Sequence, residues 1–205
     1  MSSGAHRRPL PPWVYDLVQR AAGADLLRRA LRRRTTGLDG VVLDIGGGTG
    51  WASGLLPGSR FLLIDLDLGR LLRFRAASRP GSTLAADGRR LPVASGSVDF
   101  VLCLLVAHHL DDDGLSELLT ESARALRPGS GGLIFVDALW SPGWIPGRLL
   151  WLGDRGERPR PRRDLTAILE RHFHIETAEE LTLLHRYLYA FARPRPQGGG
   201  EAVMA

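Results

Sequence analysis

The stretch VVLDIGGGTG, residues 41–50, most constrains what this chain can fold into. An apolar run rich in β-branched residues reaches an acid, Asp44, and a cluster of glycines follows at once. This pattern predicts a buried strand that runs into a tight turn against which a ligand lies. Glycine at Gly46, Gly48 and Gly50 would keep side chains out of the ligand's space, and it reaches positive φ without strain.

Further apolar runs alternate with helical patterns along the rest of the chain. Continuously apolar strands that alternate with helices are typical of an α/β fold, in which helices cover both faces of a parallel sheet. We expect strands at 41–45, 61–64, 83–86, 98–105, 132–136, 175–178 and 186–192, and helices from residue 13, around 26–31, and at 51–56, 66–77, 111–126 and 163–173.

Polar residues follow several of these strands directly. Asp65, Asp87, His108, His109 and Asp137 all stand at or just past the carboxyl end of a predicted strand. Ligands of parallel sheets bind at that edge, so residues far apart in sequence can share one cleft there. We interpret Asp137 as structural or solvent-exposed, and the other four as candidates for the site.

Three adenine-containing cofactors bind turns of this kind, and the residues around Gly50 discriminate among them. A phosphate-binding Walker loop needs a lysine after the turn, but Trp51 follows Gly50 and the chain contains no lysine. The dinucleotide pattern G-x-G-x-x-G would need a third glycine at position 51. The carboxylate of Asp44 would repel a pyrophosphate and attract a cationic sulfonium ligand with a free amino group. The turn therefore favours S-adenosylmethionine (SAM).

With these motifs the sequence resembles the class I SAM-dependent methyltransferases, and most closely their small ubiquinone/menaquinone-biosynthesis-like, type 11 subgroup. The resemblance rests on VVLDIGGGTG, FLLIDLD, AADGRRLPVASGSVDFVLCLLVAHHL and LRPGSGGLIFVD, which run in family order from Val41 to Asp137. It implies a Rossmann-like sheet of seven strands, mostly parallel with an antiparallel last strand, and helices on both faces. It also implies SAM as cofactor, S-adenosylhomocysteine (SAH) as product, and an EC 2.1.1.- activity.

The resemblance assigns roles to individual residues. It implies that Gly46, Gly48 and Gly50 line the methionyl part of SAM and that Asp44 lies near its amino group. Asp65 would accept both ribose hydroxyls, a bidentate task that suits a carboxylate. The residues alone allow a simpler interpretation, in which Asp44 caps the turn, Asp65 only ends its strand and Asp87 is an ordinary turn residue. The remaining implied cofactor contacts are Leu66 beside the adenine ring and Asp87 and Gly88 at the adenine amino group. Residues 103–106, which include Leu104, would form a wall beside the reacting methyl group.

His108 and His109 lie where a general base would be needed. Methyl transfer displaces a good leaving group, so proximity and alignment supply most of the acceleration. A base helps only when the acceptor is protonated. We therefore take His108 and His109 as candidate catalytic residues, with the alternative that they only shape the pocket. We predict no metal site.

The segment 138–163 differs in character from the rest, because it is rich in tryptophan, proline and glycine. We interpret it as a cap or insertion over the strand ends. Its tryptophans would line an apolar acceptor cavity or, alternatively, lie on a membrane surface. For His185 and Tyr187, which lie near the last two strands, core packing is the alternative. The candidate acceptor-binding residues are Trp140, Trp144, Trp151, His185 and Tyr187.

Composition sets further limits. The 205 residues suffice for one domain, which we place at 13–193 between a disordered arm at 1–12 and a disordered tail at 194–205. The net charge of +5 is carried by arginine; we interpret it as a solvated surface and expect no nucleic-acid partner. The single cysteine, Cys103, excludes an internal disulfide and fits a cytoplasmic location. We expect a monomer or homodimer, with peripheral membrane contact left open.

The sequence thus predicts a SAM-dependent methyltransferase that acts on a small natural-product, quinone-like or lipid-like acceptor. One alternative is a SAM-binding fold that does not methylate, with SAM as a structural cofactor or with a pericyclase-type activity. The motive for that alternative is the absence of a compelling base. The other alternative is a nicotinamide-dependent reductase, against which Trp51 and the absence of a Tyr-x-x-x-Lys pair argue.

Overall fold

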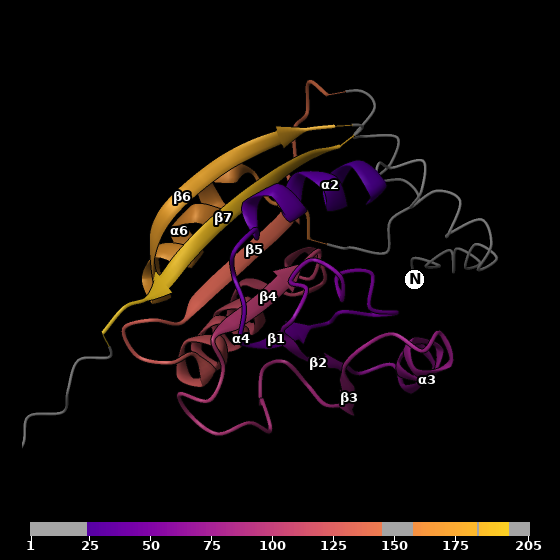
Figure 1. The fold of residues 1–205 in the computed structure, drawn as a ribbon. Helices are drawn as coiled ribbons and strands as arrows, with labels where there is room; N and C mark the ends of the chain where they lie inside the picture. The colour runs from indigo at the N-terminus through magenta and orange to yellow at the C-terminus, as the bar shows by residue number, and fades with distance from the viewer. Residues whose placement is uncertain (1–23, 145–157, 184, 197–205) are drawn as a thin grey trace, which may run out of the picture.

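The computed structural model describes residues 24–144, 158–183 and 185–196 (Figure 1). The arm at 1–12, the helix expected from Trp13, the middle of the segment 138–163 with Trp151, and most of the tail lie outside the described residues. The predicted domain boundaries therefore stay a prediction.

The described residues form one sheet of seven strands, in the order β3-β2-β1-β4-β5-β7-β6. Neighbouring strands from β3 to β5 run parallel, whereas β7 runs antiparallel to both β5 and β6. This confirms the predicted mostly parallel sheet with an antiparallel last strand. The strands are β1 (Val41–Ile45), β2 (Arg60–Asp65), β3 (Ser82–Ala85), β4 (Phe100–Leu104), β5 (Gly132–Ala138), β6 (Phe173–Thr182) and β7 (Arg186–Pro194).

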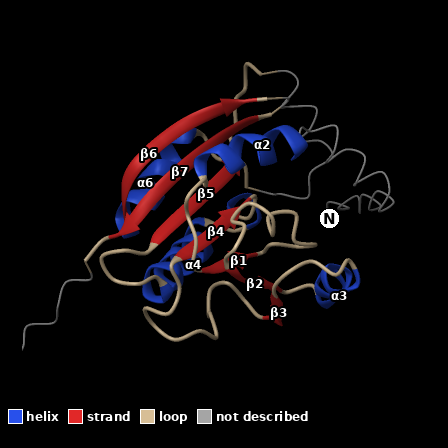
Figure 2. Ribbon diagram, viewed as in Figure 1, coloured by secondary structure: helices blue, strands red, loops and turns tan. Residues whose placement is uncertain are grey.

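Helices cover both faces of the sheet, as predicted (Figure 2). Residues of α4 and α6 share one apolar core with the sheet, and residues of α2 and α3 share the other. Along β4, Val101 and Cys103 face the first core, and Phe100, Leu102 and Leu104 face the second. Burial on both faces explains why the strand is continuously apolar. The helices are α2 (Ala24–Arg34), α3 (Leu68–Ala76), α4 (Asp112–Ala125) and α6 (Arg162–His172), with a 3-10 turn, η1, at Ala107–His109.

The helix predicted at 51–56 was wrong. This segment instead makes successive turns, in which backbone N–H groups bond to carbonyls three residues earlier, as from Ser53 to Gly50 and from Leu55 to Ala52. Gly50 (φ 74°) and Gly58 (φ 90°) bracket the segment in the left-handed region, so the backbone leaves helical geometry at both of its ends. Burial of Ala52, Leu55 and their neighbours fixes the turns in place of helix propensity.

Smaller differences concern element ends. The strand predicted at 98–105 spans only Phe100–Leu104, and Val98 makes an isolated bridge with Leu126. β6 is longer than expected, because its whole length pairs with β7. The helix predicted from residue 66 starts at Leu68, because the Asp67 carboxylate accepts a hydrogen bond from the Arg70 backbone N–H at 3.1 Å and caps α3.

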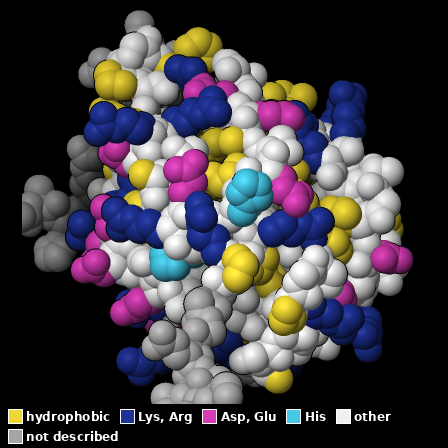
Figure 3. All heavy atoms as spheres, turned by 90° about the vertical axis from the view of Figure 1, so that its left-hand side faces the viewer, with side chains coloured by type: hydrophobic (Ala, Val, Ile, Leu, Met, Phe, Trp, Pro, Cys, Tyr) yellow, Lys and Arg dark blue, Asp and Glu magenta, His cyan; other side chains and the backbone are white. Residues whose placement is uncertain are grey.

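Many surface arginines pair with acids. The glutamates of β6 take four of them: Arg193 at 3.2 Å from Glu176, Arg34 on Glu179, and both Arg162 and Arg186 on Glu180. Figure 3 shows one face of the molecule, on which arginines and acidic side chains are interspersed. This pattern suits the interpretation of the basic charge as a solvated surface. Among the described residues, no helix has the length and apolar character needed to cross a membrane.

Candidate active site

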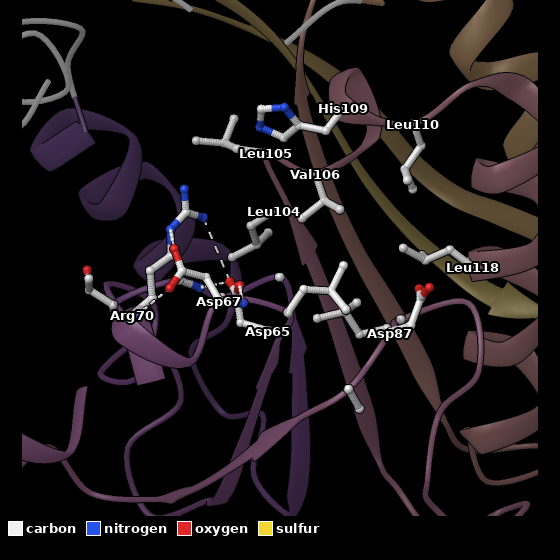
Figure 4. Close-up of a pocket in the computed structure, with 18 of the residues that line it drawn as sticks. Asp65, Asp67, Arg70, Asp87, Leu104, Leu105, Val106, His109, Leu110 and Leu118 are labelled. Carbon is white, nitrogen blue, oxygen red and sulfur yellow. Dashed lines mark hydrogen bonds and ion pairs between the residues drawn. The ribbon is translucent and has the colours of Figure 1, made fainter. Parts of the chain in front are cut away.

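A cleft of about 440 Å³ opens at the carboxyl ends of β1, β2 and β4 (Figure 4). This volume falls in the range of small-molecule sites. One side carries most of the predicted cofactor contacts, and we name it the cofactor wall after that prediction: it consists of the glycine turn 46–48 together with Asp65, Leu66, Asp87 and Gly88. We name the facing side the acceptor wall: it consists of Leu104, which was predicted as a cofactor contact, and of residues 105–106, His109, Leu110 and Leu118.

Asp65 ends β2 on the cofactor wall, and its carboxylate is held in place by backbone groups. Oδ2 accepts a hydrogen bond from the Gly48 N–H at 2.9 Å, and Oδ1 accepts one from the Asp67 N–H at 2.8 Å. The Arg70 guanidinium lies 3.9 Å from Oδ2. Because a carboxylate has about four lone-pair sites, both oxygens of Asp65 can accept further donors from the cleft.

The glycines of the turn serve different purposes. All three have positive φ: 65° at Gly46, 58° at Gly48 and 74° at Gly50. A Cβ on Gly48 would meet nothing closer than Arg70 at 3.8 Å, so only this glycine faces open space. A Cβ on Gly46 would lie 2.7 Å from Val106, and one on Gly50 would lie 2.1 Å from Phe74. Because Gly46 has no side chain, Val106 of the acceptor wall can pack closely against it. Gly50 does not line the cleft, and its missing side chain lets Phe74 of α3 pack closely.

Asp44 lies one layer behind the turn and does not line the cleft. Its side chain is buried, and Oδ2 finds no hydrogen-bond partner among the described residues. A Cβ on Gly47 would sit 2.2 Å from this oxygen. Burial, and secondarily the nearby charge of Asp65, raise the pKa of Asp44 to about 8. A buried carboxyl oxygen without a partner beneath a turn fits a ligand whose positive charge reaches that turn.

Asp87 and Gly88 close the cofactor wall after β3. The Arg89 side chain donates to both oxygens of Asp87, with Nη2 at 2.7 Å from Oδ2, and this bond lowers the pKa of Asp87. Nothing in the sequence had indicated that the Arg89 side chain would form an ion pair with the Asp87 carboxylate. A Cβ on Gly88 would lie 2.4 Å from Ile45 Cγ2, so Gly88 lets this segment approach β1 closely.

The two predicted histidines occupy different environments. His109 is exposed and borders the cleft. His108 is buried, and its Nδ1 lies 2.7 Å from Oδ1 of Asp137. The Asp137 side chain is only 1% exposed, so the solvent-exposed interpretation is wrong and the structural one stays a prediction. We had not expected Asp137 to pair with His108, because 29 residues separate them.

The four predicted acceptor-binding residues that the structure describes do not line this cleft. Trp140 and Trp144 line a separate, open hollow of about 520 Å³ together with Arg162, Glu180 and Arg186. His185 and Tyr187 are buried and pack together, with ring centroids 5.4 Å apart, which agrees with the core-packing alternative. Trp151 lies outside the described residues.

Sequence reasoning also missed several residues that line the cofactor wall. Trp51, Arg70 and Arg73 border the cleft. Arg70 could have been suspected, because it stands three residues after the helix cap Asp67. Trp51 had served only to exclude other cofactors. Among the described residues, no group of three His, Cys, Asp or Glu side chains is arranged to hold a metal ion.

Residues 43–135 match the family described as "Methyltransferase domain". Among curated proteins, a malonyl-[acyl-carrier protein] O-methyltransferase from Methylococcus capsulatus is 36% identical over 46% of this chain and 36% of its own length. The tRNA (carboxymethyluridine(34)-5-O)-methyltransferase ALKBH8 from Mus musculus is 35% identical over 48% of this chain and 15% of its own length. The chain thus spans well under half the length of these relatives.

Solved structures share the fold over most of the chain. A Pyrococcus horikoshii protein, PH0226, superposes with a TM-score of 0.67 and 18% identity, over 86% of this chain and 90% of that one. A methyltransferase solved with the Haloferax volcanii activator Trm112 gives 0.69 and 17%, over 87% and 94%. The [4+2]-cyclase SpnF gives 0.65 and 16%, over 83% and 81%. Likenesses at these identities establish the fold and no activity.

Proposed function

We propose that this chain, whose residues 43–135 are a methyltransferase domain in the class I fold, transfers a methyl group from SAM to a small-molecule acceptor. One observation carries the proposal. The Asp65 carboxylate ends β2 at the cleft, and the Gly48 N–H fixes it against the one glycine of the turn that faces open space. A carboxylate that can accept hydrogen bonds from both hydroxyls of a diol, next to backbone without side chains, suits a nucleoside that carries an extended chain.

The residues present fit both the nucleoside end and the charged amino-acid end of SAM. We assign the ribose hydroxyls to Asp65, the adenine to exposed Leu66 and to Asp87 and Gly88, and the amino group to the turn above Asp44. The buried Asp44 oxygen without a partner supports the last assignment. When bound, SAM supplies a methyl group on a positively charged sulfur that leaves as a neutral thioether. The chain's own task is to hold the acceptor in line with that methyl group and to exclude water.

The size and character of the acceptor wall support a small acceptor. Leu105, Val106, Leu110 and Leu118 are apolar and line the same cleft as the cofactor wall. The relatives named above act on a carrier-protein-bound acid and on tRNA, but each alignment covers only part of those proteins. We therefore carry neither acceptor over and propose a natural-product, quinone-like or lipid-like molecule.

Association with other molecules is part of the proposal. We propose a cytoplasmic monomer or homodimer without a nucleic-acid partner. Light scattering of the purified chain measures its oligomeric state. The Haloferax volcanii neighbour was solved with an activator protein, so a protein partner for this chain is compatible with the fold. Sedimentation with vesicles tests whether the hollow at Trp140 and Trp144 contacts membranes.

Calorimetry with SAM and SAH tests the proposal directly. We expect both to bind the purified chain with micromolar affinity, and we expect radiolabelled methyl groups to pass from SAM to members of an acceptor panel. If neither SAM nor SAH binds at high micromolar concentration, the proposed function is wrong. Binding of NADH seen by fluorescence would instead support the reductase alternative.

A second candidate function is a SAM-binding protein that does not methylate. The superposition on a [4+2]-cyclase favours it, since the same fold there belongs to a protein named for a different reaction. Tight SAH binding without methyl transfer to any member of a broad acceptor panel would select this candidate. Detectable methyl transfer would exclude it.

A further inference from the structure

The turn that follows β4 brings a histidine to the cleft. Leu105 has a positive φ of 60°, which is uncommon for a residue with a side chain, and its N–H donates to the Val136 carbonyl at 2.8 Å. Such a conformation costs about 1 kcal/mol or more and persists only where its surroundings enforce it. The chain then passes Val106, which packs against Gly46, and enters η1 with His108 and His109.

Distant segments hold η1 along its whole length. Arg160 is buried, and its guanidinium donates to the carbonyls of Ala107 at 2.8 Å and Leu110 at 2.6 Å. The Arg158 N–H donates to the His108 carbonyl at 3.1 Å. The backbone N–H of His108 donates to Oδ2 of Asp137 at 3.2 Å. The position of His109 in the cleft is therefore set in advance, which is what a reacting group requires.

Three side chains, of Asp137, His108 and His109, connect the buried strand β5 to the cleft. Asp137 on β5 accepts from Nδ1 of His108, and the His108 ring lies against the His109 ring with centroids 4.1 Å apart. Figure 4 shows His109 beside Leu105 and Val106, above the cofactor wall. A carboxylate, an oriented histidine and a histidine at the cleft thus follow one another toward the space where an acceptor would bind.

We propose that His109 removes the proton from the acceptor and that His108 and Asp137 are positioning residues that act through it. This inference rests on the proposed function and narrows its acceptor. Imidazole, with an ordinary pKa of about 6.5, exchanges protons efficiently with groups of moderate acidity. Since the surrounding wall is apolar, the acceptor is a phenol-type or enol-type hydroxyl on an apolar body.

The step balances without any further reactant. The acceptor O–H bond breaks, and its proton goes to the imidazole of His109. The oxygen lone pair forms the new bond to the methyl carbon, while the electron pair of the carbon–sulfur bond stays on sulfur. The imidazolium then returns its proton to solvent, which it can do because His109 is exposed.

A binding experiment tests this without turnover. para-Nitrophenol is added to the SAH-loaded protein at a pH only slightly below its own pKa in water, where most of the free ligand is protonated but an imidazole is still neutral enough to accept a proton. The phenolate form absorbs at longer wavelength than the phenol, so the spectrum reports where the proton is. We expect the bound ligand to show the phenolate band. The methyl ether para-nitroanisole, which has no such proton, should bind without it.

Variants assign the band to individual residues. His109→Gln should bind the ligand but lose most of the phenolate band, because the glutamine amide cannot take up the proton. His108→Ala should weaken the band, and His108→Asn should restore it, because the asparagine amide can donate to Asp137 as Nδ1 does. His172→Gln is the matched control: His172 bonds to Ser116 on α4, away from the cleft.

Each outcome decides the matter. An equal phenolate band in wild type and His109→Gln would overturn the role of His109, and equal bands in His108→Ala and wild type would overturn the positioning role. Failure of SAH-loaded protein to bind para-nitrophenol would overturn the hydroxyl class while leaving the methyltransferase proposal intact. Failure to bind SAH would instead count against the proposed function. Circular dichroism and a thermal melt confirm that every variant is folded.

Discussion

The two walls of the cleft are built in different ways. The cofactor wall comes from residues 46–88, and each of its parts ends or closely follows one of the strands β1, β2 and β3. The acceptor wall depends on long-range contacts: 29 residues separate His108 from Asp137, and 53 separate Ala107 from Arg160. A wall formed at consecutive strand ends can be recognised as a motif, whereas a wall held by distant side chains has no sequence pattern of its own.

The largest effect should come from Gly50, which serves packing and not the ligand. Gly50→Ala would place a Cβ 2.1 Å from Phe74 at a φ of 74°. Overpacking and the strained φ together should lower the free energy of unfolding by about 4 kcal/mol, measured by urea denaturation. Gly58→Ala is the control, since Gly58 also has positive φ but nothing lies within 4 Å of its added Cβ; it should lose about 1–2 kcal/mol. Equal losses would mean that Gly50 has no special packing role.

Arg160 should matter for the acceptor wall and leave the cofactor wall unchanged. Arg160→Ala removes the donors of the Ala107 and Leu110 carbonyls and should cost about 3 kcal/mol of unfolding free energy. The affinity for SAH should stay as in wild type. In the control, Arg162→Ala, an exposed ion pair with Glu180 is lost, at a cost of about 1 kcal/mol or less. A large loss of SAH affinity in Arg160→Ala would show that the two walls are not independent.

Asp65 should matter for the cofactor wall alone. Asp65→Ala removes the carboxylate that accepts from Gly48 and Asp67 and that we assign to the ribose. Loss of hydrogen bonds to a charged group, worth about 2 kcal/mol, corresponds to about 30-fold weaker SAH binding, measured by calorimetry. Asp113→Ala, an exposed acid in the first turn of α4, should bind SAH normally. Wild-type affinity in Asp65→Ala would contradict the assignment.

Asp44 should give a pH-dependent effect that is the smallest of the four within any one pH unit. Burial raises its pKa from 3.8 to about 8, so between these values the folded chain keeps a proton that the unfolded chain releases. Stability from this group is therefore greatest at low pH and falls as pH rises from 3.8 to 8, by up to about 1.4 kcal/mol per pH unit. Asp44→Asn should remove this slope, measured by urea denaturation across pH, while Asp113→Asn should keep it. Parallel curves for wild type and Asp44→Asn would refute the prediction.

The sequence was informative where local pattern and tertiary structure demand the same thing. Strands β1, β2 and β5 were predicted closely, because they are buried on both faces and must be apolar throughout. The segment 51–56 misled us because its apolar residues suit a helix, but they are buried by turns between two glycines of positive φ. The acceptor candidates at Trp140 and Trp144 misled us because composition shows that a segment is unusual, not which cavity it borders.

By itself, the sequence determined the α/β sheet and the glycines and acids that line the cleft at the carboxyl ends of β1, β2 and β3, because these residues end or closely follow buried strands. Only the tertiary structure decided that Gly50 serves packing, that Arg89 holds Asp87, and that Asp137 and Arg160 fix the histidine turn. The physical reason is that strand periodicity and turn chemistry act over a few neighbouring residues. Side-chain contacts between strand ends depend on which strands become neighbours, and the folded sheet alone settles that.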